Sequence, residues 1–262
     1  MKPFTINYWL AFALVMLFAS CEKVITLDLK TAEPLVVIEG YVSDQDEIQT
    51  VKISKTYSFT EPNKFNAVSG AQVVLMSGST SVTFSEGMPG IYESVKFAGT
   101  PGEKYTLEVI IEGKTYTASS VMPQKVPIDM LTYKKLSFFG GEETFPVINY
   151  QDPSGIQNQY RTLLSVNKEL EFNSADEDRF NDGNKVENIL FYSVDDLQPG
   201  DEMEIEFQSI DRNVFKYFFA LSQISGNGGP PTAPANPVSN FNNGALGIFS
   251  AYSTDRKTFV KQ

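Results

Sequence analysis

The chain of 262 residues has a formal net charge of −11, is 42% hydrophobic and 20% charged, and contains no histidine and one cysteine. Without histidine, neither a Ser–His–Asp or Cys–His catalytic pair nor the common zinc sites built on histidine can form, and a single cysteine excludes an internal disulfide. The negative charge opposes binding to nucleic-acid phosphates, and the composition is that of a globular chain.

The first residues have the order of a secretory signal. Lys2 provides a positive start, residues 8–19 are apolar, and small residues stand directly before Cys21. The twelve apolar residues fall short of the roughly 20 that a membrane-spanning helix needs. The residues around Cys21 resemble the lipobox of bacterial lipoproteins, in which the signal is cut before the cysteine and a lipid is attached to its sulfur. We therefore predict a signal peptide over residues 1–20 and lipidation of Cys21; the alternative is a secreted protein with an incidental cysteine.

Removal of the signal changes the composition further. Loss of residues 1–20 takes away one positive charge, Lys2, and leaves 242 residues with a net charge of −12 and without Trp9, the single tryptophan. Carboxylate pairs and Ser–Lys pairs remain chemically open to such a protein, but no spacing singles one out. We therefore predict no catalytic residues, no cofactor and no metal centre.

Residues 21–33 are expected to form the lipidated cysteine and a tether, and residues 34–122 a β-sandwich. Short runs rich in β-branched and aromatic residues alternate there with glycine-containing turns. The expected strands are 35–42, 50–56, 71–77, 80–85, 90–97, 104–112 and 114–121. Seven short strands in about ninety residues predict a two-sheet sandwich of immunoglobulin-like or transthyretin-like topology, a fold that does not by itself indicate a function.

Pro123 and Pro127 mark an expected boundary, after which residues 123–262 form a second β-rich domain. One amphipathic helix is predicted at 211–225, with Asp211 as its N-cap, Gly226 as its stop and an apolar stripe that packs on a sheet. The expected strands are 128–136, 144–151, 160–167, 187–194, 201–210, 245–253 and 257–261.

Residues 173–184 form an expected acidic loop. With Asp178 as the first ligand of a calcium-binding EF-hand, Phe180 and Ile189 would fall at the third and twelfth positions, so that motif is excluded. A solvated acidic loop is the leading interpretation, and a looser calcium site is the alternative.

Residues 225–237 form a second long loop, rich in glycine, proline and alanine and without periodicity. Long loops of this kind are usually either functional or disordered, and partner contact and plain flexibility stay equally open here. The candidate partner-facing residues are Gly226, Pro230, Pro231, Pro234 and Asn240.

Several segments together resemble a known family. They are "ITLDL" after the cysteine, "PLVVIEGYV", "YQDPSGIQNQYR" (150–161) and "NPVSNFNNGALGIFSAYS" (236–253). Their order and spacing resemble the lipoproteins of domain-of-unknown-function family 4249, common in Bacteroidetes-type bacteria, over nearly the whole chain. The matching residues are Asp152, Pro153, Gly155, Asn240, Gly244, Gly247 and Phe249, which we interpret as turn formers and their neighbours.

The resemblance implies an outer-membrane lipoprotein without an assigned activity, encoded beside TonB-dependent transporters, and it carries over no catalytic residue. The expected function is therefore a non-catalytic accessory or binding subunit, with the outer membrane and a TonB-dependent transporter as partners and no nucleic acid. One alternative is a surface adhesin or structural lipoprotein. The other is a hydrolase of exported polymers that would use Asp176, Asp178 or Asp182 in a cleft. The side of the outer membrane on which it lies stays open.

Overall fold

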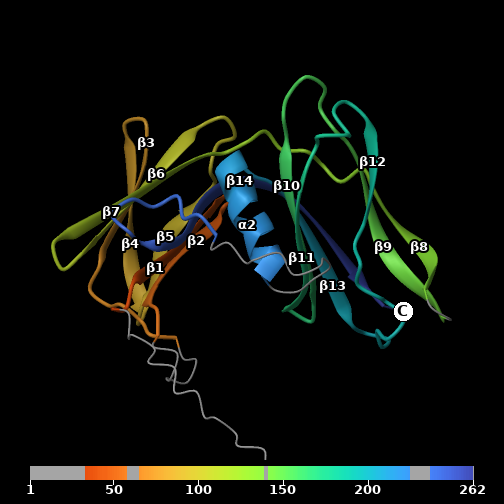
Figure 1. Ribbon diagram of the computed structural model, residues 1–262, viewed down its shortest axis with the longest axis horizontal. Coiled ribbons are helices and arrows are strands. Elements are labelled where there is room, and N and C mark those ends of the chain that lie inside the picture. The colour runs from red at the N-terminus through yellow and green to blue at the C-terminus, as the bar shows by residue number, and fades with distance from the viewer. Residues whose placement is uncertain (1–32, 58–64, 139–140, 225–236, 262) are drawn as a thin grey trace, which may run out of the picture. The chain divides into compact units, whose positions relative to one another are not determined.

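Strands dominate the computed structural model, which describes residues 33–57, 65–138, 141–224 and 237–261 and contains one helix within them (Figure 1). The strands are β1 (Val36–Ser43), β2 (Glu47–Lys55), β3 (Gln72–Ser77), β4 (Thr80–Met88), β5 (Ile91–Phe97), β6 (Lys104–Ile111), β7 (Lys114–Val121), β8 (Met130–Phe138), β9 (Gly141–Gln151), β10 (Gln159–Val166), β11 (Glu169–Glu177), β12 (Lys185–Ile189), β13 (Glu202–Ser209) and β14 (Leu246–Val260), and the helix is α2 (Arg212–Ile224). The predicted signal peptide, Cys21 and four of the loop candidates (Gly226, Pro230, Pro231 and Pro234) lie outside the described residues. Among the described residues, no helix is long and apolar enough to cross a membrane.

Strands β1–β7 and the first half of β14 form the first sandwich. Along the sheet their order is β14-β1-β2-β5-β4-β3-β6-β7. The sheet folds over at the β4–β5 hairpin, so that β1 packs on β6. The close approach is visible at Gly40 of β1, where an added Cβ would stand 2.7 Å from the Leu107 side chain of β6. Strict alternation in β6 buries Leu107 and Val109 in the shared core, as the sequence pattern predicts. The predicted N-terminal sandwich is thereby confirmed.

A second sandwich follows, in which β11-β10-β13 and the end of β14 pair as one sheet and β12-β9-β8 as another. An apolar core lies between them, and three aromatic rings occupy its centre. The centroid of the Tyr150 ring lies 5.1 Å from that of Tyr160 and 4.7 Å from that of Phe207, and the Tyr160 and Phe207 rings stack at 5.0 Å. Such aromatic pairs contribute about 0.5–1.5 kcal/mol each beyond the area that they bury.

Strand β14 takes part in both sandwiches. Its first half pairs in parallel with β1, and its second half pairs antiparallel with β13. The expectation of two strands, 245–253 and 257–261, was therefore wrong, because backbone pairing with β13 continues without a break through residues 254–256. The Arg256 side chain also bonds to Glu47 and Glu206. Residues Pro34–Gln262 form one compact unit, and the division between residues 122 and 123 stays a prediction.

Helix α2 confirms the prediction at 211–225. Asp211 caps it, since its Oδ1 accepts hydrogen bonds from the N–H groups of Asn213 at 2.8 Å and Val214 at 3.0 Å. The apolar side of the helix packs on the outer face of β14. The Arg161 guanidinium, on β10, lies 3.6 Å from the centre of the Phe218 ring, so a cation–π contact also ties the helix to the sheet.

The cap of α2 gives a first prediction. Asp211→Ala is expected to lower the free energy of unfolding by about 1–2 kcal/mol, because two N–H groups of the first turn lose their acceptor. The Ser120 hydroxyl, which donates to Asp211 Oδ2, loses its acceptor too. Urea unfolding followed by circular dichroism measures the loss. Asp211→Asn, which keeps an oxygen for the cap, is the control, and an equal loss in both variants would contradict the capping role.

Candidate functional site

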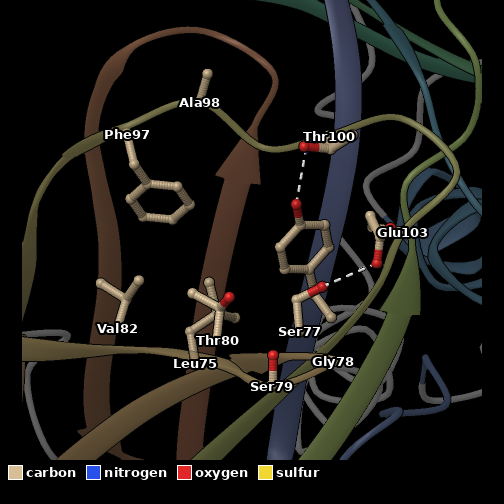
Figure 2. Close-up of a pocket in the computed structure, with 11 residues that line it drawn as sticks. Leu75, Ser77, Gly78, Ser79, Thr80, Val82, Phe97, Ala98, Thr100 and Glu103 are labelled. Atoms are coloured by element: carbon tan, nitrogen blue, oxygen red, sulfur yellow. Dashed lines mark hydrogen bonds between the residues drawn. The ribbon is translucent and has the colours of Figure 1, made fainter.

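A pocket of about 500 Å³ lies at the open end of the first sandwich, between β4 and β5 (Figure 2). The two strands pair only beside their hairpin, where Ser85 and Glu86 of β4 face Glu93 and Tyr92 of β5. Farther from the hairpin, β4 stays paired with β3 while β5 stays paired with β2. The strands therefore diverge, and the pocket opens between them.

The floor of the pocket is apolar and its rim is polar. Leu75 and Tyr105 are buried, and Val82 and Phe97 are half-buried. Figure 2 shows Phe97, Ala98 and Thr100 along one side and Leu75, Thr80 and Val82 along the other. Glu103 is the one charged residue among the described residues that line the pocket. The remaining polar residues of the lining are Ser77, Ser79, Thr80 and Thr100.

The two walls of the pocket differ in the number of hydrogen bonds that fix them. Loop 98–103 forms one wall and is fixed by three hydrogen bonds from its backbone: Gly99 N–H to Ser43 O at 2.8 Å, Gly102 N–H to Met122 O at 2.7 Å, and Thr100 N–H to the Tyr105 hydroxyl oxygen at 2.7 Å. The tip of the β3–β4 hairpin forms the other wall. It is tied across by an exposed hydrogen bond of 3.2 Å, from the Ser77 hydroxyl to Glu103 Oε2 (Figure 2).

This lining is suited to binding. Apolar surface with a few placed polar groups and a volume of about 300–1,000 Å³ is typical of ligand sites. These residues carry no local signal of a binding site, because each belongs to an ordinary strand or turn by its sequence pattern. Only the divergence of β4 from β5 makes them neighbours.

The predicted acidic loop is shorter than expected. Residues 173–177 belong to β11, which pairs with β10, so only residues 178–184 form a turn. Of the three acids named for a hydrolase, Asp178 and Asp182 lie close together. Asp176 lies in β11, where its carboxylate accepts a hydrogen bond from the Ser174 hydroxyl at 3.1 Å.

Asp178 and Asp182 lie close to a third acid, Asp152, for which the sequence pattern predicted only a turn-forming role. One carboxylate oxygen from each of the three lies within 4.8 Å of the others. Oxygens of this kind are calcium ligands, so the calcium alternative concerns these three residues. Each carboxylate also fixes the surrounding turns. Asp152 accepts from the Tyr160 hydroxyl and Gly183 N–H, Asp178 from Asn158 N–H and Asp182 from Gly155 N–H.

The cluster affects the ionisation of Asp178. Burial raises the pKa of its carboxyl above the ordinary value, the N–H of Asn158 opposes this shift, and the charges of Asp152 and Asp182 add to it. The folded protein therefore favours the protonated form of Asp178 more than the unfolded chain does.

A second prediction follows from this shift. Asp178→Asn is expected to raise the free energy of unfolding at pH 7 by up to about 1 kcal/mol in the presence of EDTA, which keeps divalent cations from compensating the charges. The stabilising contribution of Asp178 is complete below its unfolded pKa and is lost as the pH rises through its higher folded pKa. Asparagine keeps an acceptor for Asn158 N–H without the charge.

Urea unfolding between pH 4 and pH 8 tests the Asp178 prediction. The difference between variant and wild type should shrink as the pH falls. Asp182→Asn, at an exposed carboxylate, is the control and should give a smaller gain. A loss of stability in Asp178→Asn at every pH would contradict the electrostatic argument.

Asn240, the described member of the partner-facing candidates, is held against β14. Its side-chain amide donates to Phe249 O at 2.8 Å, and its side-chain oxygen accepts from Phe249 N–H at 2.9 Å. The side chain thus pairs with β14 as a neighbouring strand would. A partner-facing role for this loop stays a prediction.

Comparison with known protein families matches residues 22–258 to the family described as "Domain of unknown function (DUF4249)". A search of the curated proteins gave no match. Among solved structures, the chain is similar to the crystal structure of a DUF4785 family protein from Legionella pneumophila, with 12% sequence identity, a TM-score of 0.24, and coverage of 66% of this chain and 52% of that chain. The chain thus spans about half the length of that protein, and so low a TM-score supports no inference.

Proposed function

We propose that this chain, which belongs to the DUF4249 family of domains of unknown function, is a lipid-anchored, non-catalytic accessory subunit that binds a partner at the outer membrane. The pocket between β4 and β5 is the observation that carries the binding role. The partner that we propose is a TonB-dependent transporter, as the resemblance implies, and the membrane anchor is a lipid on Cys21.

The position of the pocket supports this arrangement. The described chain enters the first sandwich at the start of β1, next to the expected tether, while the pocket lies beside Ser43 at the end of β1. Eight residues of strand at about 3.3 Å each separate these two ends by about 25 Å. The pocket therefore lies at the end of the first sandwich opposite to the start of β1.

Charge supports a protein partner over a nucleic acid. The mature chain would carry −12, and a surface of one sign attracts partners of the opposite sign while it repels phosphate backbones. A surface adhesin would share the anchor and the sandwiches, and it differs by its partner, which would be host or matrix material.

Affinity purification of the full chain from native membranes in mild detergent, with quantitative mass spectrometry, tests the proposal. The expected result is a TonB-dependent transporter recovered in near-equal amount. An unrelated tagged lipoprotein from the same membranes is the control. Recovery of the protein alone would contradict the accessory role, and loss of attachment without loss of nutrient uptake on gene deletion would favour the adhesin.

A further inference from the structure

We propose that the pocket between β4 and β5, whose floor is formed by Leu75, Val82, Phe97 and Tyr105, is a slot for an extended peptide segment of the partner. The segment adds as a strand between residues 80–84 and residues 94–97. The inference rests on the proposed binding role and assigns the chemistry of the contact. The segment has apolar side chains at every second position and a basic residue at one end.

Two free strand edges flank the slot. Residues 80–84 of β4 pair with β3 on one side, and the β5 partners of β4 begin only at Ser85. On β5, Lys96 and Phe97 pair with β2 on one side, and Phe97 lines the slot. In the described part of the chain, no strand pairs with these two edges. Free edges offer backbone N–H and C=O groups to an added strand, which is a recurring mode of peptide recognition.

The hairpin turn determines which groups face the slot. Ser77 and Thr80 flank a two-residue turn in which Gly78 has a φ of 55°. The closing pair of such a turn exchanges both hydrogen bonds, so Thr80 and Val82 direct their backbone groups toward β3. The next residues in the alternation, Ser81 and Thr83, direct their N–H and C=O groups toward the slot.

The side chains around the slot define the sequence of the segment. An added strand would place every second side chain over the apolar floor, on Leu75, Val82, Phe97 and Tyr105, and the others toward solvent. Glu103 is the charged residue of the lining and would pair with a lysine or arginine. A compact small molecule would use the apolar floor but would leave both strand edges unpaired, so the peptide is favoured.

Hydrogen exchange measured by mass spectrometry on the full chain in mild detergent tests the inference. The probe is a synthetic peptide of seven residues in which valine alternates with threonine after an N-terminal lysine. Binding should slow exchange in segments 80–84 and 94–97. A copy N-methylated at alternate residues keeps the side chains but loses backbone donors, and it should bind at least tenfold more weakly. Equal binding of both peptides, or protection elsewhere, would overturn strand addition.

A matched pair of variants tests the same edge from the protein side. Thr83 is exposed and its N–H faces the slot, and proline is tolerated where the N–H of an edge strand points outward. Thr83→Pro should therefore stay folded yet bind the probe at least tenfold more weakly, while Thr83→Ala, which keeps the N–H, should bind as the wild type does. Circular dichroism checks folding of both.

The outcomes separate this inference from the proposed function. A transporter that co-purifies equally with Thr83→Pro and wild type would overturn the strand addition and leave the accessory role standing. Peptide binding without any co-purifying transporter would overturn the accessory role alone. If no probe with valine, leucine or phenylalanine at the alternating positions gives protection, strand addition is wrong.

Discussion

Gly247→Ala is expected to lower the free energy of unfolding by at least about 4 kcal/mol, a loss that single substitutions seldom reach. Gly247 has a φ of +95°, and a Cβ there would stand 2.0 Å from the carbonyl oxygen of Ile38. Ile38 belongs to β1, which pairs with β14 on one side and with β2 on the other. Because both neighbours hold β1 in place, its backbone cannot move away from the new methyl group.

Urea unfolding of the purified protein measures this loss, and Gly244→Ala is the matched control. Gly244 also has a positive φ, of +79°, but beyond its chain neighbours no heavy atom lies within 4 Å of the point where a Cβ would stand. The control therefore loses only the strain of the left-handed backbone, about 1–2 kcal/mol. Equal losses in the two variants would show that backbone strain alone, and not the contact with Ile38, sets the requirement for glycine.

Cys21→Ala is expected to move the protein from the membrane fraction to the soluble fraction almost completely. The predicted attachment of acyl chains to this cysteine would stabilise membrane association by about 0.8 kcal/mol for each buried methylene group, and the variant has no sulfur to acylate. The substitution should leave the folded domain unchanged, because position 21 precedes β1 in the chain.

Phase separation in a nonionic detergent, followed by immunoblotting, measures the partition of the Cys21 variant. Ser20→Ala, which keeps a small residue before the cysteine, is the control and should remain in the detergent phase. Recovery of Cys21→Ala in the detergent phase would show that another feature of the chain holds it to the membrane.

Local pattern predicted most strands of this protein and its helix. Alternation is visible in strands such as β6, where one face is buried and the other is not, and α2 combines an apolar stripe with the capping residue Asp211. The pattern failed for β11 because its polar residues, such as Asp176, resemble a loop. Pairing with β10 holds them in a strand, and no local feature of the sequence reports that pairing.

Local pattern indicated Asp178 and Asp182 as acids of one loop, but it indicated neither their neighbour Asp152 nor the pocket. Asp152 lies far from Asp178 and Asp182 in the chain, and the turns that bring them together depend on the packing of β9 against β12 and of β10 against β11. The pocket depends on which neighbours β4 and β5 keep as they diverge. Contacts of this kind follow from long-range pairing, to which a residue's own neighbours in the sequence contribute little.

The sequence by itself determined the class of fold and the absence of histidine chemistry, because composition and the period of apolar residues act within a few positions of the chain. The family followed from the resemblance of several segments and from the family match over residues 22–258. The tertiary structure alone decided that β14 joins both sandwiches, that Gly247 must lack a side chain and that a slot opens between β4 and β5. Each of these depends on the packing of strands distant in sequence, whose backbones meet only after the chain has folded.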